Sequence, residues 1–408
     1  MLTRFKSLQN QYPRQFWLLF WGMLLNATGA SMVWPFLLLY VSKRLDMPLT
    51  SIATLLTLST AASLVSSFIA GPIADRVGRK GVMVFSLFAD AVNFLLLSRA
   101  DSYAAFAAVL AARGFFNPMY RVGADAMLAD LIPERQRPEA YALARTATNA
   151  GVSIGPALGG FLAGTSYVLS FYGAAISLGT FGVLLLLLAK ETLPFDELRA
   201  ASQRGEQAQG PRREAWGGYP VILRDRVFLS FIGLLSFGWI TASLMWQIMP
   251  YYANTYFGVP EKLYGWVPTT NALMVVFLQV LVTRFTRPHP PQKMVALGIL
   301  VYGVSNGMVA LAGGFWGFWV AMAVMTIGEL IAIPTSNTYV ANTAPSDMRG
   351  RYMSIYGLVH MIGVGVGPVF GGAMNDYLGP KFIWLGGLAV GLVSAAGLYL
   401  LSRVGQRR

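Results

Sequence analysis

A lone carboxylate, Glu329, interrupts the apolar stretch TIGELIAIP near the middle of a long hydrophobic segment. An ionisable side chain inside a membrane is costly and is by default taken to be functional. Burial disfavours the charged form of a carboxyl group, which suits the uptake and release of a proton. We therefore predict that Glu329 is a proton-coupling residue; the alternative is a structural acid that pairs with an arginine.

Another apolar segment carries four polar residues, each four positions after the last: Arg113, Asn117, Arg121 and Asp125. This spacing places them on one face of a helix, and a polar face inside a membrane must meet protein or water. We expect Asp125 to take part in proton coupling, and Asn117 and Arg121 to bind substrate. Alternatively, Arg121 and Asp125 only neutralise each other.

Aromatic and methionine side chains concentrate in two segments, at 16–42 and 227–257. Aromatic rings offer flat apolar faces and attract cations, and methionine adapts to irregular shapes. Such side chains suit a lipophilic or cationic small molecule, although helix packing also uses them. The substrate contacts that we expect in these segments are Asn26, Trp34, Trp246 and Gln247.

The composition of the chain indicates a membrane protein. Of its 408 residues, 55% are hydrophobic and only 12% are charged, about half of the charged share of a soluble protein. Apolar runs of about 20 residues fit membrane helices, whereas the strands of a membrane barrel would alternate apolar and polar residues. We predict an all-α membrane protein with twelve transmembrane helices, near residues 16–42, 50–74, 81–100, 103–130, 139–163, 166–189, 227–257, 262–283, 293–313, 315–342, 351–375 and 381–402.

The distribution of charge further restricts the function. The net charge is +13, but most Lys and Arg residues lie in loops between apolar segments, which indicates membrane topology and not nucleic-acid binding. They are most frequent on the side of the two termini. We therefore expect both termini to be cytoplasmic in a plasma membrane, such as a bacterial inner membrane.

Several kinds of chemistry have no residues to support them. The chain has no cysteine and no Walker A sequence, and no nucleophile–base or zinc motif is evident. Disulfides, thiolate metal sites and nucleotide hydrolysis are therefore not expected. We predict that the protein is not an enzyme and needs no metal or cofactor, with the proton as the coupling ion.

The two halves of the sequence resemble each other. GVSIGPALGG at 151–160 returns as GVGVGPVFGG at 363–372, and the same spacing separates Pro133 from Pro345. Six apolar segments in each half imply that both halves begin on the same side of the membrane, so the repeat is parallel. We predict a six-helix bundle at 1–189, a cytoplasmic linker at 190–226 and a second six-helix bundle at 227–408.

The loop GPIADRVGRK at 71–80 resembles the signature loop of the major facilitator superfamily. The resemblance implies two bundles that rock about a central site, with this loop as a conformational latch whose acid pairs with cations or helix N-termini. The second half lacks the acid and the glycine at the equivalent place, so a symmetric latch is not expected. The implied latch residues are Gly71, Asp75, Arg76, Gly78, Arg79 and Lys80, with Asp130 and Arg145 as their partners.

The segment at 151–160 is similar to a motif of exporters in the drug:proton antiporter branch of that superfamily. Close helix approach and a proline-weakened backbone are its physical requirements. The second copy at 363–372 shows that the pattern also serves plain packing. Arg113 is similar to the span-four arginine of the family's proton-coupling motif, which implies a role in proton coupling, although Gly114 comes too early for that motif. The expected helix-packing residues are Gly151, Gly155, Pro156, Gly159 and Gly160.

Together these features predict a proton-coupled secondary transporter. We expect an antiporter of the multidrug-efflux type that exports lipophilic or cationic small molecules by alternating access, and that works as a monomer in a lipid bilayer. A first alternative is a transporter of an anionic or amphiphilic solute that uses Arg113 and Arg121. A second alternative is a non-transporting membrane sensor with the linker as its output.

Overall fold

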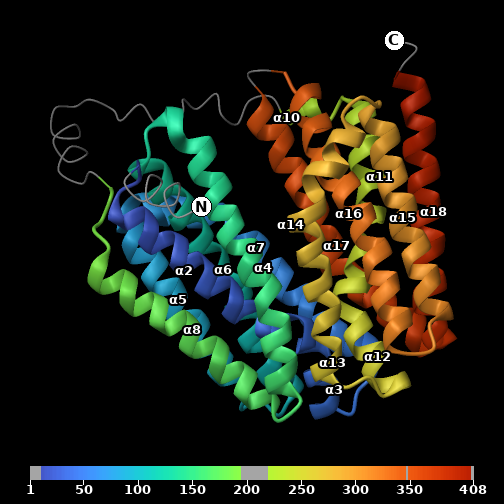
Figure 1. The fold of residues 1–408 in the computed structure, drawn as a ribbon, viewed down its shortest axis with the longest axis horizontal. Helices are drawn as coiled ribbons and strands as arrows, with labels where there is room; N and C mark the ends of the chain where they lie inside the picture. Colours follow the sequence, from blue (N-terminus) through green and yellow to red (C-terminus); the bar gives the residue numbers. More distant parts are fainter. Residues whose placement is uncertain (1–10, 194–218, 346–347, 406–408) are drawn as a thin grey trace.

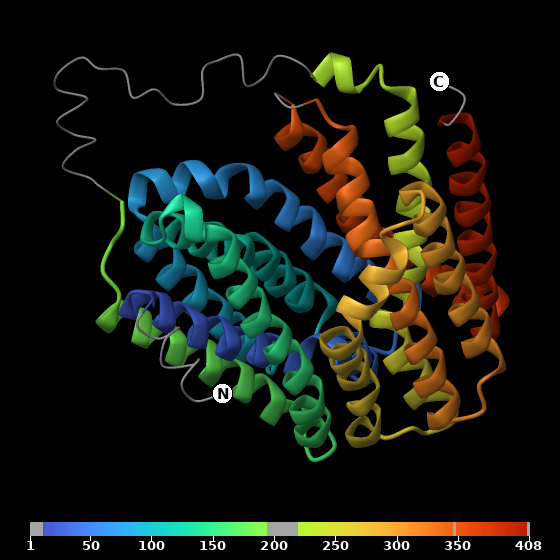
Figure 2. The ribbon, with the colours of Figure 1, turned by 45° about the horizontal axis from the view of Figure 1, so that its top comes forward.

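The computed structural model of this chain describes residues 11–193, 219–345 and 348–405, which are helical without any strand. Figures 1 and 2 show two helical bundles, one from each half of the sequence, side by side. Helices satisfy their own backbone hydrogen bonds, which is what a segment inside a bilayer requires. The prediction of an all-α membrane fold is confirmed. The predicted linker falls largely outside the described residues.

The first long helix of the described N-terminal half is interrupted at Pro35. Proline has no N–H to donate to the preceding turn, and here the α-helix is interrupted by a 3-10 turn. The elements of this half are α2 (Arg14–Val33), η1 (Trp34–Phe36), α3 (Leu37–Arg44), α4 (Leu49–Val77), α5 (Arg79–Leu97), α6 (Tyr103–Leu131), η2 (Glu134–Gln136), α7 (Arg137–Ala163) and α8 (Tyr167–Leu188).

The C-terminal half repeats this plan, with a π-turn just before Pro250 at the place of the 3-10 turn. Its elements are α10 (Tyr219–Ile222), α11 (Arg226–Ser243), η4 (Leu244–Ile248), α12 (Met249–Phe257), α13 (Glu261–Tyr264), α14 (Trp266–Thr286), α15 (Pro291–Leu311), α16 (Phe315–Thr343), α17 (Arg349–Leu378) and α18 (Pro380–Gly405).

Ten helical segments of the described residues are long and apolar enough to cross a membrane. The two remaining long helices are α6 and α7, which have 29 and 27 residues but more polar side chains. Both pack within the N-terminal bundle, α6 against α4 and α5, and α7 against α2. Counted with α6 and α7, the described part of the chain has twelve helical segments long enough to cross a membrane, which is the predicted number.

Glycines make the same contact in both halves. A Cβ atom at Gly151 would lie 2.6 Å from the carbonyl oxygen of Leu24, so α7 can approach α2 this closely only with glycine there. In the second copy, a Cβ atom at Gly363 would lie 2.5 Å from the Trp239 side chain, where α17 meets α11. The repeated sequence thus marks the same helix pair in each bundle, as a parallel duplication requires.

The two halves meet at one side of the protein. We call the side that carries the 71–80 loop the latch face and the opposite side, with the α3–α4 loop, the far face. In Figure 1 the bundles converge at the far face, where α3, α12 and α13 lie. Across the interface, α4 packs on α17, and α7 packs on α13 and α14.

Two acids of the C-terminal half bind the N-terminal half at the far face. Asp376 accepts hydrogen bonds from Leu49 N at 3.2 Å, Thr50 N at 2.8 Å and Thr50 Oγ1 at 2.7 Å, at the start of α4. Glu261 pairs with Lys43 Nζ at 2.6 Å and accepts a hydrogen bond from the Tyr167 hydroxyl. A carboxylate at a helix N-terminus satisfies free N–H groups and the helix dipole. These contacts hold the far face closed.

Replacing Asp376 by Asn should favour opening of the far face. The variant loses the negative charge that binds the start of α4, and a hydrogen bond to a charged group contributes about 1.5–3 kcal/mol. We expect the equilibrium constant for opening to rise about tenfold or more. The measurement is the distance between spin labels on cysteines placed at Asp101 and Leu311, in a chain that has no native cysteine.

Asp46 provides the matched control, because it is an exposed acid of the same face without a described hydrogen bond. Asp46→Asn should leave the distance distribution unchanged. If Asp376→Asn behaves in the same way as Asp46→Asn, the Asp376 contact does not hold the halves together.

Candidate functional site

Glu329 of α16 is partly exposed at the interface between the halves and is held by an amide. Asn271 of α14, which is buried, donates from Nδ2 to Glu329 Oε2 at 2.7 Å and to Thr326 Oγ1 at 2.9 Å. The second carboxylate oxygen, Oε1, has no described hydrogen bond and is not a buried atom. One oxygen of this carboxylate is therefore positioned by the protein and the other is free to bind a proton or a solute.

Pro334, one turn further along α16, brings a second amide to the site. Because proline has no N–H, the carbonyl oxygen of Leu330 lacks its usual partner four residues later in the helix. Gln279 of α14 donates from Nε2 to this oxygen at 3.3 Å. The proline thus creates the acceptor that keeps Gln279 beside Glu329.

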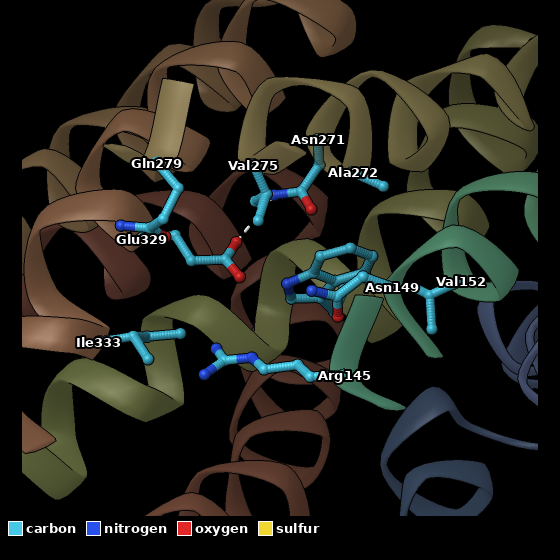
Figure 3. Close-up of a pocket in the computed structure, with 10 residues that line it drawn as sticks. Arg145, Asn149, Val152, Asn271, Ala272, Val275, Gln279, Glu329 and Ile333 are labelled. Atoms are coloured by element: carbon cyan, nitrogen blue, oxygen red, sulfur yellow. Dashed lines mark hydrogen bonds between the residues drawn. The ribbon is translucent and has the colours of Figure 1, made fainter. Parts of the chain in front are cut away.

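A cavity of about 150 Å³ lies between Glu329 and the N-terminal half, and Figure 3 shows most of the side chains that line it. Its lining residues are Arg145, Asn149 and Val152 from α7, Trp246 from η4, Asn271, Ala272, Val275 and Gln279 from α14, and Glu329 and Ile333 from α16. A second cavity of about 300 Å³ shares several of these residues and continues past Thr146, Thr283 and Asn337 toward the latch face.

Arg145 extends into the cavity from the side opposite Glu329 in Figure 3. The ion pairs described for this chain do not include Arg145 or Glu329. This placement corrects the prediction that Arg145 is a latch partner. The residue lies two turns inside α7, on the side that faces the C-terminal half, and it makes no described contact with Asp75 or Arg79.

Asn117 of α6 does not reach the cavity. It donates from Nδ2 to Asp90 Oδ2 at 2.6 Å, and Asp90 is only 2% exposed. The Arg113 guanidinium stacks over the Phe94 ring at 4.8 Å from its centre. The prediction of Asn117 as a substrate contact is therefore wrong for this structure, because its face of α6 packs on α5 and not on the C-terminal half. Arg113 belongs to the same α5–α6 contact.

Arg121 and Asp125 lie exposed on α6, nearer the latch face. They are close enough for their charges to interact, and Arg121 also lies near His360 of α17. Neither residue lines the two cavities beside Glu329. A direct role in the same site is therefore not supported by their placement.

The four predicted substrate contacts in the bent helices occupy different places. Trp246 lines the cavity, and Trp34 of η1 touches it across the interface with ring centroids 5.8 Å apart. Gln247 is buried and donates to the Val364 carbonyl oxygen at 3.2 Å, which ties it to α17. Asn26 is half-buried on α2 and does not line the cavities. Only the tryptophans adjoin the site.

The predicted latch residues cluster within the N-terminal half. Arg79 Nε lies 3.1 Å from Asp130 Oδ2, and an Arg79 terminal nitrogen lies 3.5 Å from Asp75 Oδ1. Gly78 has φ of +100°, a backbone conformation that favours glycine. Arg76 is exposed, and no atom lies within 4 Å of a Cβ placed on Gly71. In this structure Asp75 and its cations are engaged with their own half.

Glu191, which the sequence analysis did not single out, anchors the latch. It follows α8, and its carboxylate accepts hydrogen bonds from Arg79 N at 2.9 Å and Lys80 N at 3.0 Å. These are free N–H groups at the start of α5. A side chain on Gly78 would collide with the same carboxylate. The glycine is therefore needed both for the turn and for the approach of Glu191.

Asn271 and Gln279 were also missed, although the sequence carries a signal for them. They are uncharged polar residues eight positions apart in an apolar segment, which puts them on one face of α14. A polar face of a membrane helix points to a protein or water partner. Pro334, five residues after Glu329, was a second signal.

Comparison with known proteins gives a consistent assignment. A family model described as Major Facilitator Superfamily matches residues 19–260 and 239–408. A Na(+), Li(+), K(+)/H(+) antiporter of Planococcus maritimus is 29% identical over 376 residues, covering 85% of this chain and 86% of the relative. Quinolone resistance protein NorA of Staphylococcus aureus (strain MRSA252) is 20% identical over 363 residues, covering 89% and 90%. The fold resembles that of a POT family transporter crystallised with 5-aminolevulinic acid, with TM-score 0.77, 15% identity and 96% coverage of each chain.

Replacing Glu191 by Ala should destabilise the N-terminal half. The variant loses the cap at the start of α5, and such a cap contributes about 0.5–2 kcal/mol. We expect the melting temperature of the purified protein to fall by about 2–4 °C. Glu134→Ala is the control, because that acid is exposed and its described ion pair is a long one, with Arg137 at 3.5 Å. Equal melting temperatures for the two variants would contradict the anchoring role of Glu191.

Proposed function

The chain belongs to the major facilitator superfamily, and on this premise we propose that it is a proton-coupled antiporter that exports lipophilic or cationic small molecules. The observation that carries the proposal is the carboxylate of Glu329 in the cavity between the halves. It is hydrogen-bonded by Asn271 and is not neutralised by a described ion pair. A carboxylate of this kind can bind a proton and a cationic solute alternately.

The conformation of the protein supports alternating access. The far face is closed by Asp376 and Glu261, while the cavities lead from Glu329 toward the latch face. The excess of Lys and Arg in the loops of the latch face makes this side cytoplasmic by the positive-inside rule. The structure then represents a state in which a solute from the cytoplasm reaches Glu329.

Coupling follows from competition for one negative charge. A cationic solute that binds the deprotonated carboxylate is carried outward, and a proton that replaces it outside is carried inward. Because the exchange of one monovalent cation for one proton moves no net charge, the pH difference drives it, and one pH unit, about 1.4 kcal/mol, supports a concentration ratio of roughly 10. One proton per cycle is sufficient for useful export.

Two relatives support exchange of this kind by their names. One is named as a Na(+), Li(+), K(+)/H(+) antiporter, and the other as a quinolone resistance protein. The anion alternative is less well supported, because Arg113 lies over Phe94 on the α5 side of α6 and not in the cavity. The sensor alternative depends on the linker, of which residues 194–218 lie outside the described part of the chain.

Glu329→Gln should abolish uphill export. The amide keeps the size of the side chain but cannot exchange a proton. In proteoliposomes with an imposed pH gradient, we expect the gradient-driven movement of a cationic dye such as ethidium to fall at least about a hundredfold, to the level of protein-free vesicles. Gradient-driven transport that persists in Glu329→Gln would remove this residue from the coupling role.

Asp90→Asn gives the matched comparison. It is the same change from acid to amide, made at a buried acid that Asn117 holds inside the N-terminal bundle. If Glu329 alone exchanges the proton, Asp90→Asn retains gradient-driven transport. Loss of transport in Asp90→Asn but not in Glu329→Gln would transfer the role to Asp90.

A further inference from the structure

The cavity beside Glu329 contains charges of both signs, one from each half of the protein. Glu329 belongs to α16 of the C-terminal half, and Arg145 belongs to α7 of the N-terminal half. Figure 3 shows both side chains extending into the same space. Neither has a described ion pair, so each charge is available to a solute.

When the latch face closes, leaving the charges of Glu329 and Arg145 unpaired raises the free energy of the closed state. While the cavity is open, water can solvate both groups. When α7 approaches α16, the water must leave, and an unpaired charge removed from water carries a penalty of several kcal/mol. A solute with only a cationic group would neutralise Glu329 but leave Arg145 unpaired and add a repelling charge. A solute with only an anionic group would leave Glu329 unpaired.

On the basis of the proposed antiport function, we infer that the preferred solute is a zwitterion whose amine binds Glu329 and whose carboxylate binds Arg145. Binding to the protonated site replaces the carboxyl proton by the ammonium group and releases that proton to water. Arg145 offers two parallel N–H donors to a carboxylate, a geometry that strengthens and orients the contact. The solute then bridges the two halves at the face that must close.

The rest of the cavity restricts the body of this solute. Val152, Ala272, Val275 and Ile333 provide an aliphatic wall, and the indole of Trp246 adds an aromatic surface. Asn149 and Gln279 contribute amides near the charged ends. The cavity of about 150 Å³ accommodates one substituted ring, and the adjoining cavity of about 300 Å³ leaves room for a larger body such as that of a dye. We therefore expect a small solute with an apolar centre and opposite charges at its two ends.

Three probes with one skeleton test this inference. They are 4-(aminomethyl)benzoic acid, which is a zwitterion, its methyl ester, which is a cation, and its N-acetyl derivative, which is an anion. We expect the purified protein to bind the zwitterion at least about tenfold more tightly than either analogue, because each lost contact is a charge-assisted hydrogen bond. Calorimetric titration measures the three dissociation constants.

Two variants test which residue binds which charged group of the solute. Arg145→Gln should make the zwitterion and the ester bind equally, and Glu329→Gln should make the zwitterion and the N-acetyl derivative bind equally. Arg145→Lys, which keeps the charge but loses the paired donors, should retain part of the preference and guards against a folding defect in Arg145→Gln. Arg284→Gln is the control, because Arg284 is an exposed arginine at the end of α14 away from the cavity, and it should keep the wild-type preference.

The outcomes separate this inference from the proposed function. If the ester binds the wild type as tightly as the zwitterion, or if the zwitterion does not bind, the inference is overturned. Proton-coupled export of the cationic dye can persist in either case, so the antiport function would stand. If Glu329→Gln still transports against a gradient, the antiport function fails, whatever the probes show. A preference for the zwitterion that Arg145→Gln does not change would also overturn the role of Arg145.

Discussion

A charge inside a membrane protein must be paired, hydrated or neutralised, and this constraint explains how the centre of the protein is arranged. Glu329 is hydrogen-bonded on one oxygen by Asn271 and open on the other. The second amide, Gln279, is fixed by the carbonyl oxygen that Pro334 leaves free. The site is thus built from groups that support a carboxylate without neutralising it, which is the condition for reversible exchange of its partner.

The duplication accounts for the frame around this site but not for its chemistry. Gly151 and Gly363 bring equivalent helices together in the two bundles, α7 onto α2 and α17 onto α11. The charged groups do not follow the repeat, since the acid Glu329 lies in one half and the facing Arg145 in the other. The two halves therefore have similar scaffolds but line the cavity with different polar residues. A movement of one half relative to the other would change the distance between Arg145 and Glu329.

The sequence was sufficient for the architecture because hydrophobic length, loop charge and repeated glycines are properties of single segments. It was less informative about the site, because a side chain's neighbours depend on how helices pack. The spacing of Arg113, Asn117, Arg121 and Asp125 correctly put them on one helix, but that helix presents Asn117 to α5. Arg145 was assigned to the latch from the family resemblance, yet it lies in the cavity. Asn271 and Gln279 were overlooked because an uncharged amide is a weak signal in sequence.

The helix pair α4 and α17 extends from the latch face to the far face. These helices run in opposite directions across the interface, and each ends near an acid, Asp75 for α4 and Asp376 for α17. Asp376 binds the start of α4 at the closed far face, whereas Asp75 lies 3.5 Å from Arg79 of its own half. An acid at a helix C-terminus is unfavourably placed with respect to the dipole of its own helix, and Asp376 gains from the N-terminus of α4. In the described conformation one of these acids is thus bound across the interface, and the other is bound within its own half. Under the proposed antiport function, a ligand exchanged at Glu329 shifts the equilibrium between two conformations only by its difference in affinity for them.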